Sequence, residues 1–484
     1  MSNQITRDKI VVSLLWRILE RGGTQGIQFL VQIILARVLL PEEYGVIAIV
    51  SLFTIIAGVF VQSGLNTALI QKKDADETDF SSVFYLSVII AGVVYTVLFF
   101  IAPVIASFYS EPELIPVLRI LSTALFLGAF NSIQNAIIAR NMQFKLLFYS
   151  SLISTTVSGA FGIAMAYMNF GVWALVAQQI INQFTIAFVL WFTVKWRPKL
   201  IFSIDRVKGL FSFGWKLLVS SLLDNFYTNA RSLIIGKIYN AEMLAYYNRG
   251  EQFPSLIISN IDTSIQSVMF PTLAQQQDNK QRVKDMMRRS IITSTFLVFP
   301  LMVGLAVIAK PLIIILLTDK WIPSISFLQI SCAVYALYPV HQANLQAINA
   351  LGRSDIVLKL EIIKKIIGVI ILVITVFYGV YAIALGVLIV GIICTFLNAY
   401  PNLKLLNYSY KEQLMDIMPA LGLSLIMGVA AYCVNFLNLF MVLTLVLQVI
   451  IGVVVYFFLA YIFKLECFTY LLSVIRDIYK RRMA

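Results

Sequence analysis

Long apolar runs separated by short polar stretches dominate this chain. Residues 83–105 and 147–168 are examples, and a helix needs about 20 apolar residues to cross the hydrocarbon layer of a membrane. Together these apolar runs predict about fourteen membrane-spanning helices joined by short loops. The predicted spans are 9–39, 44–69, 80–107, 114–139, 145–168, 171–194, 210–238, 243–272, 290–317, 323–350, 356–378, 380–406, 414–436 and 438–463.

The first twelve spans form two similar halves. Residues 170–175 (Phe-Gly-Val-Trp-Ala-Leu) recur in kind as 378–383 (Tyr-Gly-Val-Tyr-Ala-Ile). An even number of spans in each half makes the repeat parallel, with its axis along the membrane normal, and two like lobes are typical of a transporter. The predicted domains are an N-lobe at 1–194, a cytoplasmic linker at 195–209, a C-lobe at 210–406, two further helices at 407–463 and a cytoplasmic amphipathic tail at 464–484.

Composition supports an all-α polytopic membrane protein, because 60% of the residues are hydrophobic and only 13% are charged. The start of the chain carries charges that rule out a cleavable signal peptide, so the first helix should remain. Four cysteines at no motif spacing and a single histidine predict no metal site, and we expect no cofactor. Short loops and one histidine also argue against a membrane enzyme, such as a glycan polymerase or an acyltransferase.

The net charge of +13 invites comparison with nucleic-acid-binding proteins, but its placement argues against that class. Most Lys and Arg residues fall at the chain ends and in the loops that would share one face of the membrane. Positively charged residues stay on the cytoplasmic side during insertion. The pattern therefore predicts a bacterial plasma-membrane (inner-membrane) protein with both termini in the cytoplasm.

Two helices carry matched polar stripes. In the first span the stripe covers an arc of about 140° at 100° per residue, and in the seventh it covers about 120°. The stripe of the first span is Arg17, Glu20, Arg21, Thr24, Gln25, Gln28 and Gln32, and that of the seventh is Lys216, Ser220, Asp224, Thr228 and Arg231. A charge at the bilayer centre costs at least ~2.5–3.5 kcal/mol, so these groups should face water or each other. We expect a basic, hydrated cavity between the lobes, although Arg17 and Arg21 could instead extend to the cytoplasmic surface.

Other polar residues within the spans allow more than one interpretation. Arg249 in the eighth span is assigned to the same cavity. Asp224 is the candidate for coupling transport to H⁺ or Na⁺. His341 fits an interhelical hydrogen bond better than a proton relay. The amides of the fourth and tenth spans suit either sugar hydroxyls or bonds between helices.

Three segments resemble a known family: 39–45 (Leu-Leu-Pro-Glu-Glu-Tyr-Gly), 62–65 (Gln-Ser-Gly-Leu) and 171–175 (Gly-Val-Trp-Ala-Leu). They are similar to Wzx-like flippases of O-antigen, colanic acid and teichuronic acid, within the multidrug/oligosaccharidyl-lipid/polysaccharide exporter superfamily. The resemblance covers essentially the whole chain. It implies two six-helix lobes, two additional helices and a cationic central cavity.

The same resemblance implies a function. It is the movement of undecaprenyl-diphosphate-linked oligosaccharide from the cytoplasmic to the outer leaflet by alternating access, for cell-surface polysaccharide biosynthesis. By residue type and helix, the residues implied to engage the diphosphate are Arg17, Arg21, Lys216 and Arg231. The partners implied are the lipid-linked oligosaccharide, membrane lipids and possible polysaccharide polymerases and glycosyltransferases. The alternative is a cation-coupled drug exporter of the same superfamily, but the embedded cations outnumber the acids, which favours an anionic substrate.

Overall fold

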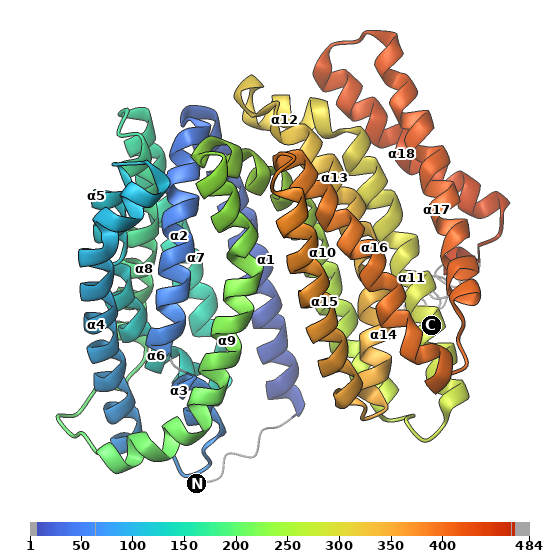
Figure 1. The fold of residues 1–484 in the computed structure, drawn as a ribbon. Helices are drawn as coiled ribbons and strands as arrows, with labels where there is room; N and C mark the ends of the chain where they lie inside the picture. Colours follow the sequence, from blue (N-terminus) through green and yellow to red (C-terminus); the bar gives the residue numbers. More distant parts are fainter. Residues whose placement is uncertain (1–6, 63, 466, 470–484) are drawn as a thin grey trace. The chain divides into compact units, whose positions relative to one another are not determined.

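The computed structural model describes residues 7–62, 64–465 and 467–469, with the side chains of 7–15, 17–21, 213, 262–264, 266–268, 270 and 271 outside that description. Within these residues the chain forms eighteen α-helices and two short 3₁₀ helices, with no β-strand (Figure 1). Most of the amphipathic tail predicted at 464–484 lies outside the described residues. The predicted all-α architecture is confirmed.

Nine helical segments of the described chain are long and apolar enough to cross a membrane. They are Pro41–Gln71, Glu77–Tyr109, Leu114–Arg140, Phe144–Tyr167, Val172–Thr193, Lys280–Val307, Val380–Leu405, Tyr410–Leu437 and Met441–Ile462. The other predicted spans also form helices but are not among these nine. The chain is therefore a multi-pass membrane protein, and the number fourteen stays a prediction.

The chain packs as two compact units, which divide between Ala245 and Tyr246. The first unit contains α1 (Arg7–Val38), α2 (Pro41–Gln62), α3 (Leu65–Gln71), α4 (Glu77–Tyr109), α5 (Leu114–Leu121), α6 (Ala124–Arg140), α7 (Phe144–Tyr167), α8 (Val172–Thr193), α9 (Ile204–Ile238) and the start of α10 (Ala241–Ala274). Helix α9, the first helix of the predicted C-lobe, thus packs on α2, α3 and α4 of the first unit. The repeat-based lobe boundaries stay a prediction.

The second unit contains the rest of α10 and all the later helices of the described chain. These are α11 (Lys280–Val307), α12 (Ala309–Leu317), η1 (Asp319–Trp321), α13 (Ser324–Ala336), α14 (Tyr338–Ala350), α15 (Ser354–Thr375), α16 (Val380–Leu405), α17 (Tyr410–Tyr432), η2 (Cys433–Leu437) and α18 (Met441–Ile462). Helix α17 packs along α11 and α18, so the two helices outside the repeat are built onto one side of this unit.

Several predicted spans differ from the observed helices in instructive ways. The fourth and tenth spans are each broken, into α5 and α6 and into α13 and α14, so the break itself is repeated. Polar first turns extend other helices beyond their apolar spans. Helix α9 starts at Ile204 because the Ser203 side chain caps the Arg206 N–H, and α11 starts at Lys280 because Asn279 caps the Arg282 N–H at 3.0 Å.

The repeated Gly-Val motif has a backbone explanation. Gly171 and Gly379 are the residues immediately before α8 and α16, with φ of 56° and 111°. Both values lie in the region that side chains disfavour and glycine adopts freely. The motif therefore marks the turn that begins the last helix of each repeat.

The starts of α2, α8 and α10 lie close together in the first unit. A Cβ on Gly45 would lie 1.9 Å from the Ala241 carbonyl oxygen, so α2 touches the first turn of α10 backbone to backbone. Two residues earlier, Glu43 Oε2 accepts the Leu40 N–H at 2.7 Å, while its Oε1 lies 2.6 Å from the place of a Cβ on Gly171. The Leu-Pro-Glu-Glu-Tyr-Gly turn thus contacts the starts of both α8 and α10.

The segment between α8 and α9 is fastened to the start of α4. Asp76 and Asp79 form a reciprocal capping box there, and Lys72 reaches the fully buried Asp79 at 2.6 Å. The backbone N–H of Asp79, followed by Arg206 and Lys72, lowers the pKa of the Asp76 carboxyl below its ordinary value. The side chains of Ser81 and Ser82 accept backbone N–H groups of the linker.

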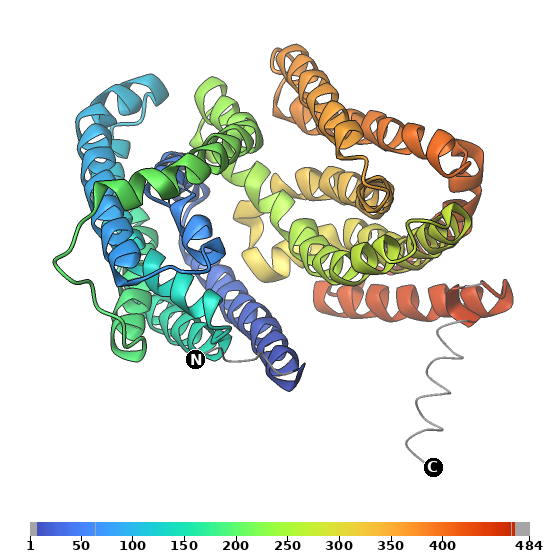
Figure 2. The same cartoon turned by 90° about the horizontal axis from the view of Figure 1, so that it is seen from below.

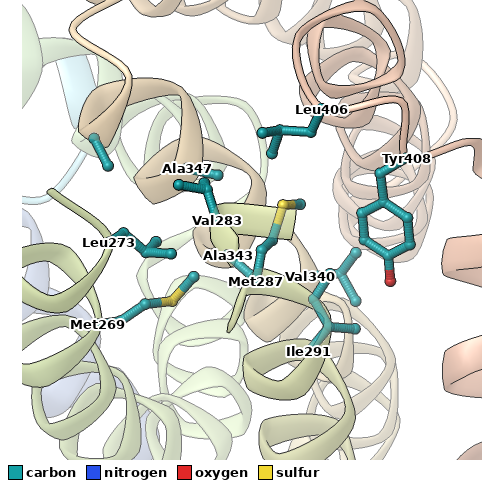
Figure 3. Close-up of a cluster of buried hydrophobic side chains, with 11 residues drawn as sticks. Met269, Leu273, Val283, Met287, Ile291, Val340, Ala343, Ala347, Leu406 and Tyr408 are labelled. Carbon is teal, nitrogen blue, oxygen red and sulfur yellow. The ribbon is translucent and has the colours of Figure 1, made fainter. Parts of the chain in front are cut away.

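In the second unit, an apolar cluster and a small polar network pack together. Figure 3 shows Met269 and Leu273 of α10, Met287 of α11 and Tyr408 packed around α14. Tyr408 donates a hydrogen bond of 2.6 Å to Asp416, which also pairs with Arg288 at 2.9 Å. These contacts join α11 to α17.

Replacing Gly45 by alanine should destabilise the fold. The added Cβ meets a backbone carbonyl that cannot rotate away, and forced overpacking costs about 1–3 kcal/mol. The midpoint of thermal unfolding in detergent, followed by size-exclusion chromatography, should fall. Gly58→Ala on the same helix meets nothing within 4 Å and is the control, with a midpoint that is unchanged or higher. Equal midpoints for both variants would contradict the backbone contact.

Asp79→Asn should destabilise the protein far more than Glu77→Gln. Asp79 is fully buried, so removing its charge leaves Lys72 without its ion-pair partner. Breaking a buried ion pair typically lowers the free energy of unfolding by ~3–5 kcal/mol. Because Lys72 is 29% exposed, we expect a loss at the lower end of that range. Glu77 and Lys199 are both more than half exposed, and such a pair contributes roughly 0–1 kcal/mol. The same thermal measurement distinguishes them. A Glu77→Gln loss as large as that of Asp79→Asn would refute this ranking.

A polar cavity in the first unit

A cavity of about 800 Å³ lies among the helices of the first unit. Its walls are α1, α2, α7 and α8, which run side by side in Figures 1 and 2, together with α5, α6 and one residue of α9. The lining residues are Thr24, Gln28, Gln32, Ser51, Thr54, Ile55, Gly58, Val59, Val61, Gln62, Leu121, Ala124, Leu125, Gly128, Ser151, Ser154, Thr155, Ser158, Gln178, Gln179, Asn182, Gln183, Ile186 and Asn225. Amides and hydroxyls predominate, and the described lining holds no acidic or basic side chain.

Helical periodicity brings these polar groups together. On α8, Gln178, Gln179, Asn182 and Gln183 lie on one face at spacings of one, three and four residues. The opposite face of α8 is apolar and exposed, with Phe184 and Phe188 stacked on one another. The helix therefore turns an amide face to the cavity and an aromatic face to the surroundings.

Helix α7 supplies hydroxyls in fixed positions. Ser154 and Ser158 are buried, and each donates its hydroxyl proton to a carbonyl three residues earlier on its own helix. Their oxygens accept the side-chain N–H groups of Asn182 at 3.4 and 3.3 Å. This contact orients Asn182, whose carbonyl oxygen has no partner among the described residues.

Close packing behind the cavity depends on glycine. A Cβ on Gly159 of α7 would lie 2.5 Å from the side chain of Val31 on α1. One on Gly162 would lie 3.0 Å from Gln178. Helices α1, α7 and α8 therefore pack tightly on one side, and their polar faces are held around the cavity on the other.

The predicted site residues fall into separate groups. Gln28 lines the cavity, together with Thr24 and Gln32 of the same predicted stripe. Gln25 is half-buried on α1 and is not part of the lining. Arg17, Glu20 and Arg21 lie on α1, but their side chains are outside the described residues.

The stripe predicted on α9 is also divided. Lys216 and Asp224 are exposed and Arg231 is half-buried, and none of them lines the cavity, whereas the neighbouring Asn225 does. Arg249 lies in the second unit, buried, where it donates to Gln252 at 2.7 Å and stacks 4.9 Å from the ring centre of Trp321. Their assignment to substrate binding stays a prediction.

Most of the cavity was not anticipated from the sequence. The amides of α8 and the hydroxyls of α7 were missed, although their spacing along each helix could have revealed them. In the second unit, the structure decides between the two interpretations of the other polar groups. The ring of His341 contacts Asn398 and Thr395 at 3.1 Å each, and Asn344 bonds to Gln413 and Asn402 across helices. The interhelical interpretation of His341 is confirmed.

Comparison with known proteins places the chain in a family. A family model described as polysaccharide biosynthesis protein matches residues 34–326. The chain belongs to this family. It is 28% identical to the succinoglycan biosynthesis transport protein ExoT of Rhizobium meliloti over 309 residues. The aligned residues make up 63% of this chain and 62% of ExoT. The chain thus matches less than two thirds of the length of ExoT.

Two further similarities cover more of the chain. It is 23% identical to the lipopolysaccharide biosynthesis protein WzxC of Escherichia coli over 437 residues. The aligned residues make up 89% of this chain and 88% of WzxC. Among solved structures it is similar to the lipid II flippase MurJ in an inward closed conformation, with a TM-score of 0.74 and 16% identity. That match covers 93% of this chain and 98% of the other, and it shows a shared fold. The predicted Wzx-like resemblance is confirmed.

Cysteine labelling tests whether the cavity is wet. In a variant whose four native cysteines are replaced, Gln183→Cys should react roughly tenfold or more faster with a charged thiosulfonate reagent than Phe188→Cys, because the reactive thiolate forms only where water reaches. Reaction rates in lipid nanodiscs, which expose both faces of the bilayer, provide the measurement. Equal rates at the two positions would show that the amide face does not line an aqueous cavity.

Proposed function

We propose that this chain is a flippase for polyprenyl-diphosphate-linked oligosaccharide, which it moves from the cytoplasmic to the outer leaflet during surface polysaccharide biosynthesis. The observation that carries the proposal is the amide- and hydroxyl-lined cavity inside a multi-pass membrane protein of the polysaccharide biosynthesis family. The names of its relatives, a transport protein for succinoglycan biosynthesis and a flippase for lipid II, support the same function.

A glycan cannot cross the hydrocarbon layer alone, because each hydroxyl would lose its hydrogen bonds with water. Leaving such a group unpaired in an apolar medium costs about 1–3 kcal/mol, and a trisaccharide has many. Amides both donate and accept, so they can replace water around hydroxyls in either orientation. Gln179 and Gln183 have no hydrogen-bond partner within the described structure, which leaves them available for a ligand.

The diphosphate requires positive charge. Arg17, Arg21, Lys216 and Arg231 are the proposed partners, and the first two follow the α1 stripe of Thr24 and Gln28 toward the start of the helix. The membrane potential assists, because moving one negative charge outward gains about 2.3 kcal/mol per 100 mV. Coupling to H⁺ or Na⁺ at Asp224 is part of the proposal.

The proposal includes the membrane and the partners. The clustering of Lys and Arg at one set of loops supports an inner-membrane location with both termini in the cytoplasm. The chain would act between glycosyltransferases, which build the lipid-linked glycan, and a polymerase, which uses it. The alternative is a cation-coupled drug exporter of the same superfamily, and the names of the relatives, which are polysaccharide biosynthesis proteins, favour the flippase.

A transport assay tests this function. In proteoliposomes containing a fluorescent polyprenyl-diphosphate trisaccharide, the wild type should move the lipid between leaflets without changing its mass. Gln179→Leu combined with Gln183→Leu should slow that movement roughly tenfold or more, since each lost hydrogen bond is worth about 0.5–1.5 kcal/mol. Phe188→Leu, on the outer face of α8, is the matched control and should transport normally.

Two results would overturn the proposal. One is no movement of the lipid by a correctly folded wild type. The other is a covalent change in the glycan, which mass spectrometry of the recovered lipid would reveal and which would indicate an enzyme.

A further inference from the structure

The linker segment, residues 194–208, joins α8 to α9, includes the start of α9 and turns apolar side chains outward. Leu200 is 95% exposed, the highest value among the large hydrophobic side chains of the described chain. Ile201 and Phe202 follow at 44% and 48%, and Ile204 is 60% exposed at the first position of α9. A contiguous exposed apolar patch usually marks a contact surface.

Hydrogen bonds hold the linker segment against α4. The backbone N–H of Lys199 donates to Ser81 Oγ at 3.1 Å, and that of Ser203 donates to Ser82 Oγ at 3.0 Å. Figure 1 shows the segment at the lower end of the first unit, beside the start of α4. The apolar residues between the two bonds are therefore presented outward from a fixed backbone.

The same bonds give the depth of the linker segment in the membrane. Helix α4 is long and apolar enough to cross a membrane, and Ser81 lies four residues after its first residue, about 6 Å along the helix axis. The segment thus lies at the level where a spanning helix passes from headgroups into hydrocarbon. Trp196, which packs on Phe80 and Phe84, is typical of that level. Exposed apolar side chains at this depth can enter the edge of the hydrocarbon layer.

Basic side chains surround the apolar ones. The linker segment contains one acidic residue, Asp205, and five basic residues, all of them exposed: Lys195, Arg197, Lys199, Arg206 and Lys208. Long basic side chains extend along apolar surface and place their charge at the level of the lipid phosphates. Each one near an anionic leaflet strengthens binding to it roughly fivefold. An apolar strip flanked by cations is complementary to the surface of an anionic bilayer.

We propose that the linker segment lies in the plane of the membrane surface and binds anionic phospholipids of the leaflet on the proposed cytoplasmic side. Its apolar side chains enter the edge of the hydrocarbon, and its basic side chains bind the phosphate groups. Because the segment is bonded to α4 and continues into α9, bound lipid holds the starts of both helices at the membrane surface. This role is independent of the substrate that the chain moves.

Spin labelling measures the depth of the linker segment. In a variant whose four native cysteines are replaced, a nitroxide is attached at Leu200→Cys or at Gln277→Cys, a control in an exposed turn of the second unit. In anionic lipid nanodiscs, the collision rate with oxygen, divided by that with a neutral nickel complex, should be roughly fivefold or more higher at position 200, because oxygen concentrates in hydrocarbon and the complex in water. Leu200 is 95% exposed, so its replacement should leave folding intact.

Exchange of the lipid tests the role of the basic side chains. At position 200, the nickel collision rate should fall roughly threefold or more when phosphatidylcholine nanodiscs are replaced by nanodiscs that contain phosphatidylglycerol. Lys195→Gln, Lys199→Gln and Lys208→Gln together should abolish this difference. Lys310→Gln combined with Lys320→Gln, exposed on the predicted opposite face, is the control and should preserve it.

Each contrary outcome refutes a stated part of the inference. If the nickel complex reaches position 200 as readily as position 277, the linker segment faces water and the whole inference fails. Rare collisions with both reagents would show that another part of the chain covers Leu200, which also excludes lipid contact. If position 200 has the expected depth but phosphatidylglycerol changes nothing, binding of anionic headgroups is refuted.

Discussion

Hydrocarbon provides no hydrogen-bond partners, so each polar group in the membrane segments of this chain must find another polar group or water. The structure shows three solutions. At the helix ends, Lys72 and Asp79 form a buried ion pair. In the second unit, amides and His341 bond to one another across helices. In the first unit, many amides and hydroxyls converge on a cavity, which is the arrangement that can exchange water for a polar ligand.

The two units differ in what their amides contact, although the two predicted halves of the chain share two backbone features. Both repeats begin their last helix at a glycine with positive φ, and both break the same span into two helices. The buried amides Asn344, Asn402 and Gln413 stabilise packing in the second unit, whereas Gln179 and Gln183 of the first unit face open space.

Glycines allow close contacts between helices of the first unit. Gly159 lets α7 approach α1, and Gly45 lets α2 meet the start of α10. Glu43 sits beside Gly171 at the start of α8. The segments that carry the family resemblance therefore hold helices at fixed distances, and the polar residues between those helices provide the chemistry. The segments that carry the family resemblance and most of the residues that line the cavity are therefore different parts of the first unit.

Hydrophobicity along the sequence determined the helical class and the positions of most helices, because these depend on local composition and spacing. The stripe on α1 was predictable for the same reason, and Gln28 confirms part of it. Helix ends were less predictable where capped polar turns, such as that of Ser203, extend beyond the apolar span. Only the tertiary structure decided that α7 and α8 supply eight of the fifteen amide and hydroxyl side chains in the described cavity lining and that Arg249 is packed against Trp321. The physical reason is that a polar helical face can meet water, a ligand or another helix, and its neighbours in space determine which.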